Sequence, residues 1–268
     1  MHPITRIIII IAVVWLLFVL LLYLFQESMI FYPQQIPHDY RLKFSKYEIT
    51  INNNGNRLHG WFIKNNISKD SPLIIYYGGN GEEVSGNLWS INDFHTGSFL
   101  FMNYRGYGDS EGRPSEINLC SDALFIVDYI TKKEKIPLEN IVIMGRSLGS
   151  GVAAYVARHR NVGSLILVTP FDSLLNVAKS YYPVFPVSLL LRHRFDSLTY
   201  IHEIKLPMIS IIGTEDEVIP NKNSMNLFKH WGGPKELITI TGAGHNNIDS
   251  YDQYWKSINL FLAGNKKY

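Results

Sequence analysis

The stretch IMGRSLGSG, residues 143–151, places one serine between two glycines where two sequence patterns meet. Residues 141–144, before the first glycine, are all apolar, as in a buried β-strand. Residues 151–158, after the second glycine, have a helical pattern. Gly145 and Gly149 leave room where a strand and a helix crowd each other, so Ser147 can adopt a strained backbone that projects its hydroxyl. The stretch therefore predicts a sharp G-x-S-x-G turn between a strand and a helix, the setting of an exposed serine nucleophile.

Short apolar runs without polar alternation recur on both sides of this turn, and they are typical of parallel strands covered on both faces. They occupy residues 72–77, 98–104, 140–144, 164–168, 207–212 and 236–240. Ahead of them, two strand-like segments at 47–51 and 58–63 flank the turn-forming NNNGN and predict an antiparallel hairpin. Helical patterns occur at 117–133, 151–158, 223–231 and 257–262. The order predicts an α/β fold with a mostly parallel sheet of eight strands and helices on both faces.

One long segment, residues 171–206, interrupts this alternation between the sixth and seventh predicted strands. It contains the apolar stretch YYPVFPVSLLL, residues 181–191. We call residues 171–206 the cap insertion, because we expect it to lie over the carboxyl edge of the sheet.

The N-terminal segment differs from the rest of the chain. Residues 7–25 carry no charge and no glycine, and as a helix they would extend roughly 28 Å, close to the thickness of the hydrocarbon layer of a bilayer. A cleaved signal peptide is the alternative, but no small-residue cleavage pattern follows. We expect a single-pass membrane anchor at residues 1–28 and one folded domain at 29–268. Arg6, just before the span, favours an N-terminus in the cytoplasm and a large domain on the extracytoplasmic side.

A serine hydroxyl needs a base to become nucleophilic near pH 7, and the base needs an acid to orient it. After the strand at 207–212 comes Asp216, and after the strand at 236–240 comes His245. Parallel strands place the loops after them at the same edge of the sheet as Ser147. Glu215, Glu217 and, after the strand at 164–168, Asp172 are alternative acids. The order serine, acid, histidine is the order expected when the serine lies on such a turn, so we predict a triad of Ser147, Asp216 and His245.

Backbone N–H groups near Ser147 would stabilise the negative oxygen that forms during acyl transfer. Leu148, at the start of the predicted helix, supplies one of them. The glycine-rich loop YYGGNGEE, residues 76–83, follows the third predicted strand and supplies the second, assigned to Gly79 with Asn80 as the alternative. This loop is not a phosphate-binding motif, and the sequence has no H-E-x-x-H or C-x-x-C pattern. We therefore expect no metal ion and no cofactor.

Composition excludes other classes of protein. With 46% hydrophobic and 18% charged residues, the chain can form a substantial core. A net charge of +2 and the lack of a lysine- or arginine-rich block argue against nucleic acid as a partner. The single cysteine, Cys120, permits no internal disulfide and is expected to pack in the core.

Several motifs resemble, in order, those of the α/β-hydrolase superfamily, and within it the Bem46-like group that includes the ABHD12-, ABHD13- and ABHD17-type serine hydrolases. They are FYPQ (31–34), YYGGNGEE (76–83), NYRGYGDSEGRPSE (103–116), GRSLGSGVA (145–153), PFDSL (170–174), RFDSL (194–198), GTEDEVIP (213–220) and GAGHNN (242–247). Two positions depart from the pattern of the group. Residues 77–82 read Y-G-G-N-G-E where relatives often have H-G-N-A-G-N, and Asn103 stands where many have aspartate.

The resemblance implies hydrolysis of esters or thioesters of lipid-like substrates, and the apolar N-terminal segment would anchor such an enzyme in a membrane. A peptidase or amidase that uses the same triad is an alternative. A third possibility is a membrane-bound scaffold with a non-catalytic hydrolase fold, which an intact set of Ser147, Asp216 and His245 argues against.

Overall fold

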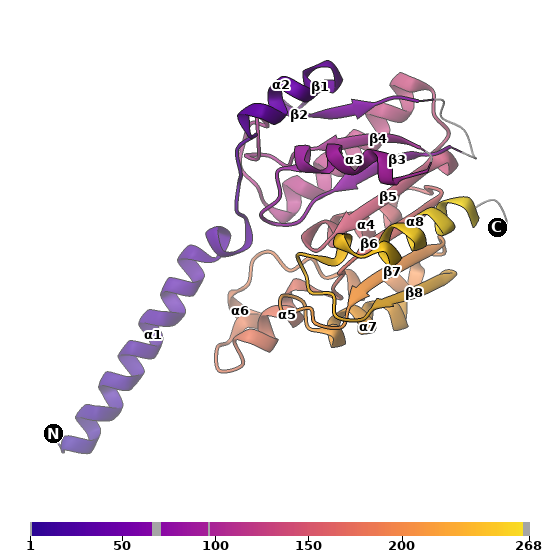
Figure 1. Cartoon of the computed structure of the whole chain (residues 1–268). Helices are drawn as coiled ribbons and strands as arrows, with labels where there is room; N and C mark the ends of the chain where they lie inside the picture. Colours follow the sequence, from indigo (N-terminus) through magenta and orange to yellow (C-terminus); the bar gives the residue numbers. More distant parts are fainter. Residues whose placement is uncertain (1, 66–70, 96, 265–268) are drawn as a thin grey trace.

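The structure is a computed structural model that describes residues 2–65, 71–95 and 97–264. A long N-terminal helix, α1 (Pro3–Ile30), extends away from an α/β body built on one eight-stranded sheet (Figure 1). Apolar side chains surround α1 on every face, and most of them are exposed. The described chain therefore has one helix long and apolar enough to cross a membrane, although a signal sequence would have the same composition.

The sheet has the strand order β1-β2-β4-β3-β5-β6-β7-β8. Its strand β2 runs antiparallel to both neighbours, and all strand pairs from β4 to β8 are parallel. The predicted eight strands and the mostly parallel sheet are thus confirmed. The strands are β1 (Glu48–Asn53), β2 (Asn56–Ile63), β3 (Leu73–Tyr77), β4 (Ser98–Met102), β5 (Ile141–Arg146), β6 (Ser164–Val168), β7 (Met208–Gly213) and β8 (Lys235–Ile240).

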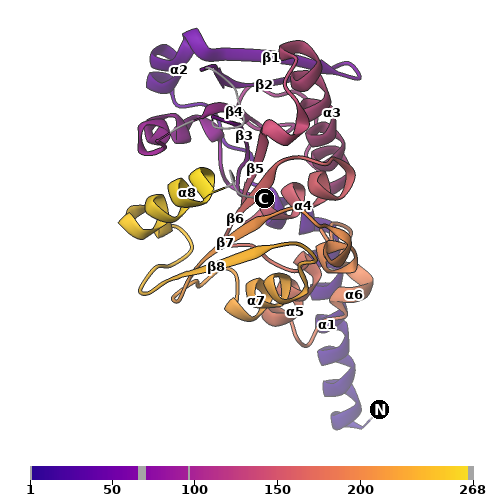
Figure 2. The ribbon, with the colours of Figure 1, turned by 90° about the vertical axis from the view of Figure 1, so that its right-hand side faces the viewer.

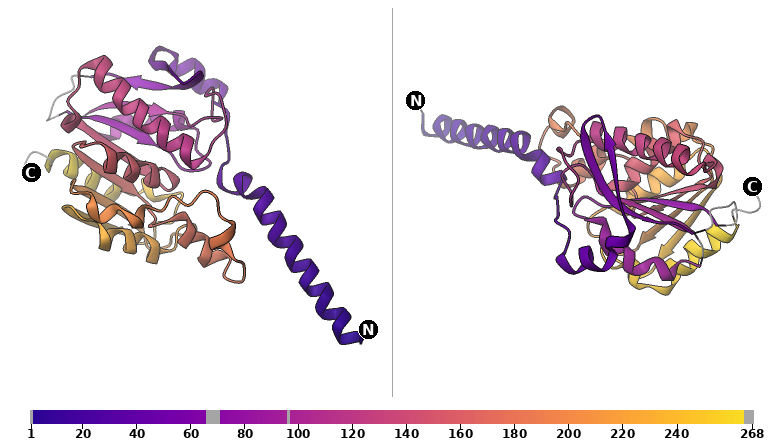
Figure 3. Two further views of the ribbon diagram at one scale, coloured as in Figure 1. Left: turned by 180° about the vertical axis from the view of Figure 1, so that it is seen from behind. Right: turned by 90° about the horizontal axis from the view of Figure 1, so that it is seen from above.

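Helices cover both faces of the sheet, as Figure 2 shows edge-on and Figure 3 shows from behind and from above. The helices α3 (Glu116–Glu134), α4 (Leu148–His159) and α7 (Asn221–His230) lie on one face, and α8 (Asp252–Gly264) lies on the other with the 3₁₀ segment η2 (Val84–Asp93). A short helix, α2 (His38–Phe44), precedes the first hairpin. Between β6 and β7, the cap insertion contains α5 (Leu174–Tyr181), α6 (Val187–Leu190) and two short 3₁₀ turns, η4 (Ser197–Thr199) and η5 (Ile201–Glu203).

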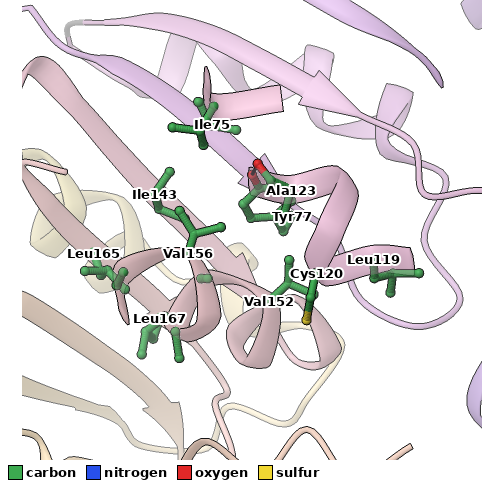
Figure 4. Packing of buried hydrophobic residues seen from close by; sticks show 14 of the residues in the cluster. Ile75, Tyr77, Leu119, Cys120, Ala123, Ile143, Val152, Val156, Leu165 and Leu167 are labelled. Carbon is green, nitrogen blue, oxygen red and sulfur yellow. Dashed lines mark hydrogen bonds between the residues drawn. The ribbon is translucent and has the colours of Figure 1, made fainter. Parts of the chain in front are cut away.

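Successive residues of each central strand enter two different hydrophobic cores. In β3, Ile75 and Tyr77 pack with residues of α3 and α4, while Ile74 and Tyr76 pack on the opposite face with residues of α8. Figure 4 shows the first core, where Val152 of α4 and Cys120 of α3 lie against the sheet. Burial on both faces explains why these strands read as continuous apolar runs.

The strand order reverses direction at β3, because the chain passes from β3 out to β4 and then returns to form β5 on the other side of β3. In sheets of this kind, ligands bind at the carboxyl ends of the strands where the order reverses. The loops that follow β3 and β5 leave neighbouring strands at that point. The topology therefore brings the loop 78–83 next to the turn that contains Ser147.

Candidate active site

Ser147 lies at the turn between β5 and α4, in a backbone conformation that L-residues rarely adopt. Its φ is 50° and its ψ is −117°. The backbone N–H of Ser147 donates to the carbonyl of Val168 at the end of β6 (2.9 Å), which ties the turn to the neighbouring strand. Strain of this kind at one residue persists only where the surroundings enforce it. The predicted strand–turn–helix setting of Ser147 is therefore what the chain adopts.

The two glycines that flank the turn are required by close backbone approaches. A Cβ atom on Gly149 would lie 2.0 Å from the carbonyl oxygen of Tyr77, at the end of β3. One on Gly145 would lie 2.4 Å from the carbonyl oxygen of Gly149. Neither position can hold a side chain unless the helix moves off the sheet, so the glycines let α4 begin directly above the strand ends.

Asp216 and His245 meet at the carboxyl ends of β7 and β8. The imidazole Nδ1 of His245 lies 2.9 Å from Oδ2 and 3.1 Å from Oδ1 of Asp216. Both side chains are almost completely buried. The carboxylate is itself oriented, because its Oδ1 accepts the backbone N–H groups of Val218 (2.9 Å) and Ile219 (2.7 Å). An acceptor carboxylate at Nδ1 favours the tautomer that carries its proton there, which leaves Nε2 unprotonated and able to act as a base.

The alternative acids make other contacts. Asp172 is buried and accepts from the side-chain amides of three asparagines, Asn176, Asn223 and Asn226. It thereby joins the start of the cap insertion to α7, and it makes no contact with His245. The Glu217 carboxylate accepts a hydrogen bond from the backbone N–H of His245 (3.2 Å) and not from its imidazole ring. Glu215 is exposed. Of the acids considered, Asp216 is the one placed at the imidazole.

Arg146 connects the serine turn to the histidine loop. Its guanidinium donates to the backbone carbonyl of His245 (3.1 Å), so the residue just before Ser147 contacts the residue predicted to be its base. The side chains of Ser147 and His245 are not hydrogen-bonded to each other in this conformation. Such contacts are often long in an enzyme without substrate and tighten when substrate binds.

In the loop after β3, one backbone N–H does not have the role that was expected from the sequence. The N–H of Gly79 donates to the carboxylate of Glu82 (2.8 Å), so it is not free to bind a substrate oxygen, contrary to the assignment from sequence. The reason is local: the loop turns back on itself, and the carboxylate three residues later reaches the amide. Within the described parts of the chain, the N–H groups of Asn80 and Leu148 have no acceptor. Gly79 nevertheless lies beside the serine, because a Cβ on it would be 3.7 Å from Cβ of Ser147.

Glu82 is a residue that the sequence analysis missed. Besides Gly79, it accepts from the Tyr76 hydroxyl (2.8 Å) and the Asn87 amide (2.7 Å), and it lies 3.7 Å from the Arg146 guanidinium. Burial and the nearby Glu82 carboxylate raise the pKa of Tyr76 well above its ordinary value, so its hydroxyl stays protonated and donates. Burial opposes the charge on Arg146, but the carboxylates of Glu82 and Asp249 help to raise the pKa of its guanidinium on balance. The feature of the sequence that could have identified Glu82 is its position directly after the glycines of this loop.

Among the residues whose placement is described, no three His, Cys, Asp or Glu side chains gather into a set that could hold a metal ion. The groups at the strand ends are instead the Ser147 hydroxyl, the paired imidazole and carboxylate of His245 and Asp216, and backbone N–H groups without an acceptor, such as those of Asn80 and Leu148. This combination is suited to acyl transfer through a serine.

Comparison with known proteins agrees with this architecture. Residues 71–188 match the family model for the alpha/beta hydrolase fold. The Mycobacterium tuberculosis protein Rv2307c is 32% identical over 200 residues, which cover 74% of this chain and 71% of that protein. The chain belongs to the α/β-hydrolase family. Other relatives of this hydrolase are the human alpha/beta hydrolase domain-containing protein 17B (28% identity, 80% of this chain and 74% of that protein) and the Arabidopsis thaliana protein WAV2 (29% identity, 91% and 89%).

Solved structures share the fold of the hydrolase at lower sequence identity. An alpha-beta hydrolase from Vibrio vulnificus superposes with a TM-score of 0.66 at 19% identity, covering 86% of each chain. A soluble variant of monoglyceride lipase from Saccharomyces cerevisiae superposes with a TM-score of 0.61 at 16% identity, covering 81% of this chain and 94% of the lipase. These likenesses show the fold, which an acetyl xylan esterase from Paenibacillus and the yeast lipase also have.

Proposed function

We propose that the hydrolase is a membrane-anchored serine hydrolase that cleaves carboxylic esters or thioesters of lipid-like acyl groups through Ser147, His245 and Asp216. The observation that carries the proposal is the buried pair of His245 and Asp216, at the same sheet edge as a serine held in a strained turn. A strained, glycine-flanked serine has little structural purpose unless its hydroxyl is used.

In the proposed mechanism, Nε2 of His245 accepts the proton of Ser147 as Oγ attacks the acyl carbonyl carbon. Asp216 stabilises the imidazolium that forms. His245 then gives the proton to the departing alkoxide or thiolate, which leaves an acyl-enzyme on Ser147. Water, deprotonated by His245, attacks the acyl carbonyl, and the Ser147 oxygen leaves as a hydroxyl by recovering that proton. The cycle releases one carboxylic acid and one alcohol or thiol.

Two backbone amides would stabilise the oxyanion of each tetrahedral intermediate. We propose the N–H groups of Leu148 and Asn80, because neither has an acceptor elsewhere in the described chain. Each such donor contributes about 3 kcal/mol to stabilising the transition state. Gly79, with its N–H donating to Glu82, then acts by holding the loop close to Ser147.

The retention of α1 as an anchor is supported by its contacts with the folded domain. Gln26, near the end of α1, is buried, its side-chain amide donates to the carbonyl of Leu190 (3.1 Å), and its side-chain carbonyl accepts the N–H of Arg192 (2.8 Å). Cleavage after residue 25 or 26 would remove or loosen these contacts. We propose that the folded domain is on the extracytoplasmic side, because Arg6 precedes the span.

The test is labelling of the full-length protein in detergent micelles with a fluorophosphonate probe. We expect wild type to be labelled at Ser147, and Ser147→Ala to be neither labelled nor able to hydrolyse p-nitrophenyl butyrate. An unlabelled, inactive wild-type protein that has a normal melting transition would contradict the proposal. Faster turnover of an aminoacyl p-nitroanilide than of the matching ester would favour a peptidase or amidase instead.

A further inference from the structure

A cavity of about 190 Å³ separates the end of α1 from the cap insertion. Its walls come from both: Leu22, Gln26 and Met29 on the helix, and residues such as Val177, Ala178 and Tyr182 on the cap insertion. Gln26 is the only lining residue with an amide or charged side chain, and its polar atoms are already hydrogen-bonded to the chain. The cavity therefore offers an occupant mainly apolar contacts, with the hydroxyls of Tyr181 and Tyr182 as the other polar groups among its lining residues.

The cap insertion contacts α1 over a considerable length. At one end, Arg192 lies 3.3 Å from the Glu27 carboxylate. At the other, the ring of Phe185 stacks on Trp15 with centroids 6.2 Å apart. Twelve residues separate Trp15 from Glu27, which is roughly 18 Å of helix. In Figures 2 and 3 the tip of the cap insertion accordingly lies beside α1 rather than at its end.

This contact has a consequence for how deep the cap insertion lies in a membrane. Arg6 carries a charge, so if Trp15 were at the surface of the bilayer, the uncharged residues 7–14 of α1 would have to span the hydrocarbon layer alone. Those residues make roughly 12 Å of helix, far short of the 30 Å of a hydrocarbon layer. A helix that spans the membrane must therefore place Trp15, and with it Phe185, inside the apolar layer. The exposed apolar side chains of the cap insertion agree with this position: Val184 is 71% and Leu189 is 85% exposed to solvent.

The cavity also adjoins the predicted catalytic loop. Tyr181 lines the cavity, and its hydroxyl donates to the backbone carbonyls of Glu217 (2.8 Å) and Val218 (3.0 Å). These residues directly follow Asp216. An occupant of the cavity would thus lie between the membrane helix and the loop that orients His245.

We infer that this cavity binds one acyl chain of a bilayer lipid while the cap insertion lies in the membrane beside α1. This inference rests on the proposed function: the cavity would select long-chain substrates that enter the enzyme laterally from the bilayer. A dry cavity of about 150 Å³ holds a benzene molecule, so the present one has room for about seven or eight carbon atoms of a chain. The rest of a longer chain would extend along the exposed apolar face of α1.

The first test is photocrosslinking of the full-length protein in nanodiscs that hold one copy each. The probe is phosphatidylcholine with a diazirine in the middle of one chain. We expect lipid adducts on peptides that line the cavity, those containing Val177 or Met29. Ala178→Trp and Met29→Trp, which fill the cavity from opposite walls, should reduce those adducts at least fivefold. Lys179→Trp adds the same side chain on the exposed side of α5 and should not.

Equal adduct yield in Ala178→Trp, Met29→Trp and wild type would overturn the inference, because it would mean contact with bulk lipid only. Adducts that form only in discs holding two copies would also overturn it, since a second chain would then shape the site. Met29 lies on α1 outside the α/β body, so Met29→Trp remains informative should Ala178→Trp fail to fold.

The second test is kinetic and compares the kcat/KM for p-nitrophenyl palmitate with that for p-nitrophenyl acetate. Both cavity variants should lower the palmitate-to-acetate ratio at least tenfold, because excluding a few methylene groups removes that much binding. The ratio for Lys179→Trp should stay within twofold of wild type. An unchanged ratio in both cavity variants would overturn the selection of long chains. If the fluorophosphonate probe does not label Ser147 of the wild-type protein, the proposed function is contradicted. Crosslinking needs no turnover, so it would still show whether the cavity binds an acyl chain.

Discussion

Replacing Asp216 by asparagine tests the orientation of the predicted base. Oδ1 of Asp216 accepts two backbone N–H groups, from Val218 and Ile219, so the asparagine oxygen must take that position. Its NH₂ group then faces Nδ1 of His245, which lies 2.9 Å from Oδ2 in the wild type. A donor at that place favours the tautomer with the imidazole proton on Nε2, because the asparagine oxygen lies farther from Nδ1, at 3.1 Å. The ring can then no longer accept the proton of Ser147.

We expect kcat for p-nitrophenyl butyrate to fall by about 10⁴, equivalent to roughly 5.5 kcal/mol of transition-state stabilisation, as for other triads with the wrong tautomer. The melting temperature should stay close to that of wild type, because both backbone hydrogen bonds to the loop are kept. Glu215→Gln, a neutralisation of the neighbouring exposed carboxylate, is the control and should retain full activity. An Asp216→Asn enzyme within tenfold of wild type would refute the reasoning.

Three further predictions concern the body of the protein. Gly149→Ala would place a Cβ 2.0 Å from the Tyr77 carbonyl oxygen, so we expect a loss of about 3 kcal/mol in the free energy of unfolding, measured by urea denaturation; wild-type stability would contradict the close approach. Asp122→Ala removes the carboxylate that lies 2.7 Å from the largely buried guanidinium of Arg105, so we expect the free energy of unfolding to fall by about 3 kcal/mol. An unchanged denaturation curve would argue against this ion pair. Burial raises the pKa of Cys120 to about 12, so iodoacetamide at pH 8 should not modify the native protein, and alkylation should follow the unfolding curve; rapid reaction of native protein would place the thiol at the surface.

Local patterns along the chain were sufficient to predict the sheet. The predicted strand at 164–168 coincides with β6, and the runs at 72–77 and 236–240 differ from β3 and β8 by one residue at the start. This accuracy has a physical origin. A parallel strand buried on both faces needs apolar residues at every position, so its sequence is distinct from that of the neighbouring helices. The helix α2 and the 3₁₀ segment η2, which lack such a pattern, were not predicted.

The candidate site could be predicted in part. The positions of Ser147, Asp216 and His245 follow from strand order, because the carboxyl ends of parallel strands share one edge. The pairing of Asp216 with His245, against the rival Asp172, depended on side-chain directions that spacing cannot supply. The same holds for Glu82, whose carboxylate takes the N–H of Gly79 through a turn in the loop.

By itself, the sequence determined which segments are strands, where the serine turn lies and that the first helix is apolar on every face. These are properties of residues close together in the chain, where periodicity and glycine placement act directly on the backbone. Only the tertiary structure decided that α1 packs against the cap insertion. Gln26 donates a hydrogen bond to the backbone carbonyl of Leu190, and the ring of Trp15 stacks on the ring of Phe185. More than 160 residues separate these partners, and such contacts depend on how whole elements pack, which no local pattern encodes.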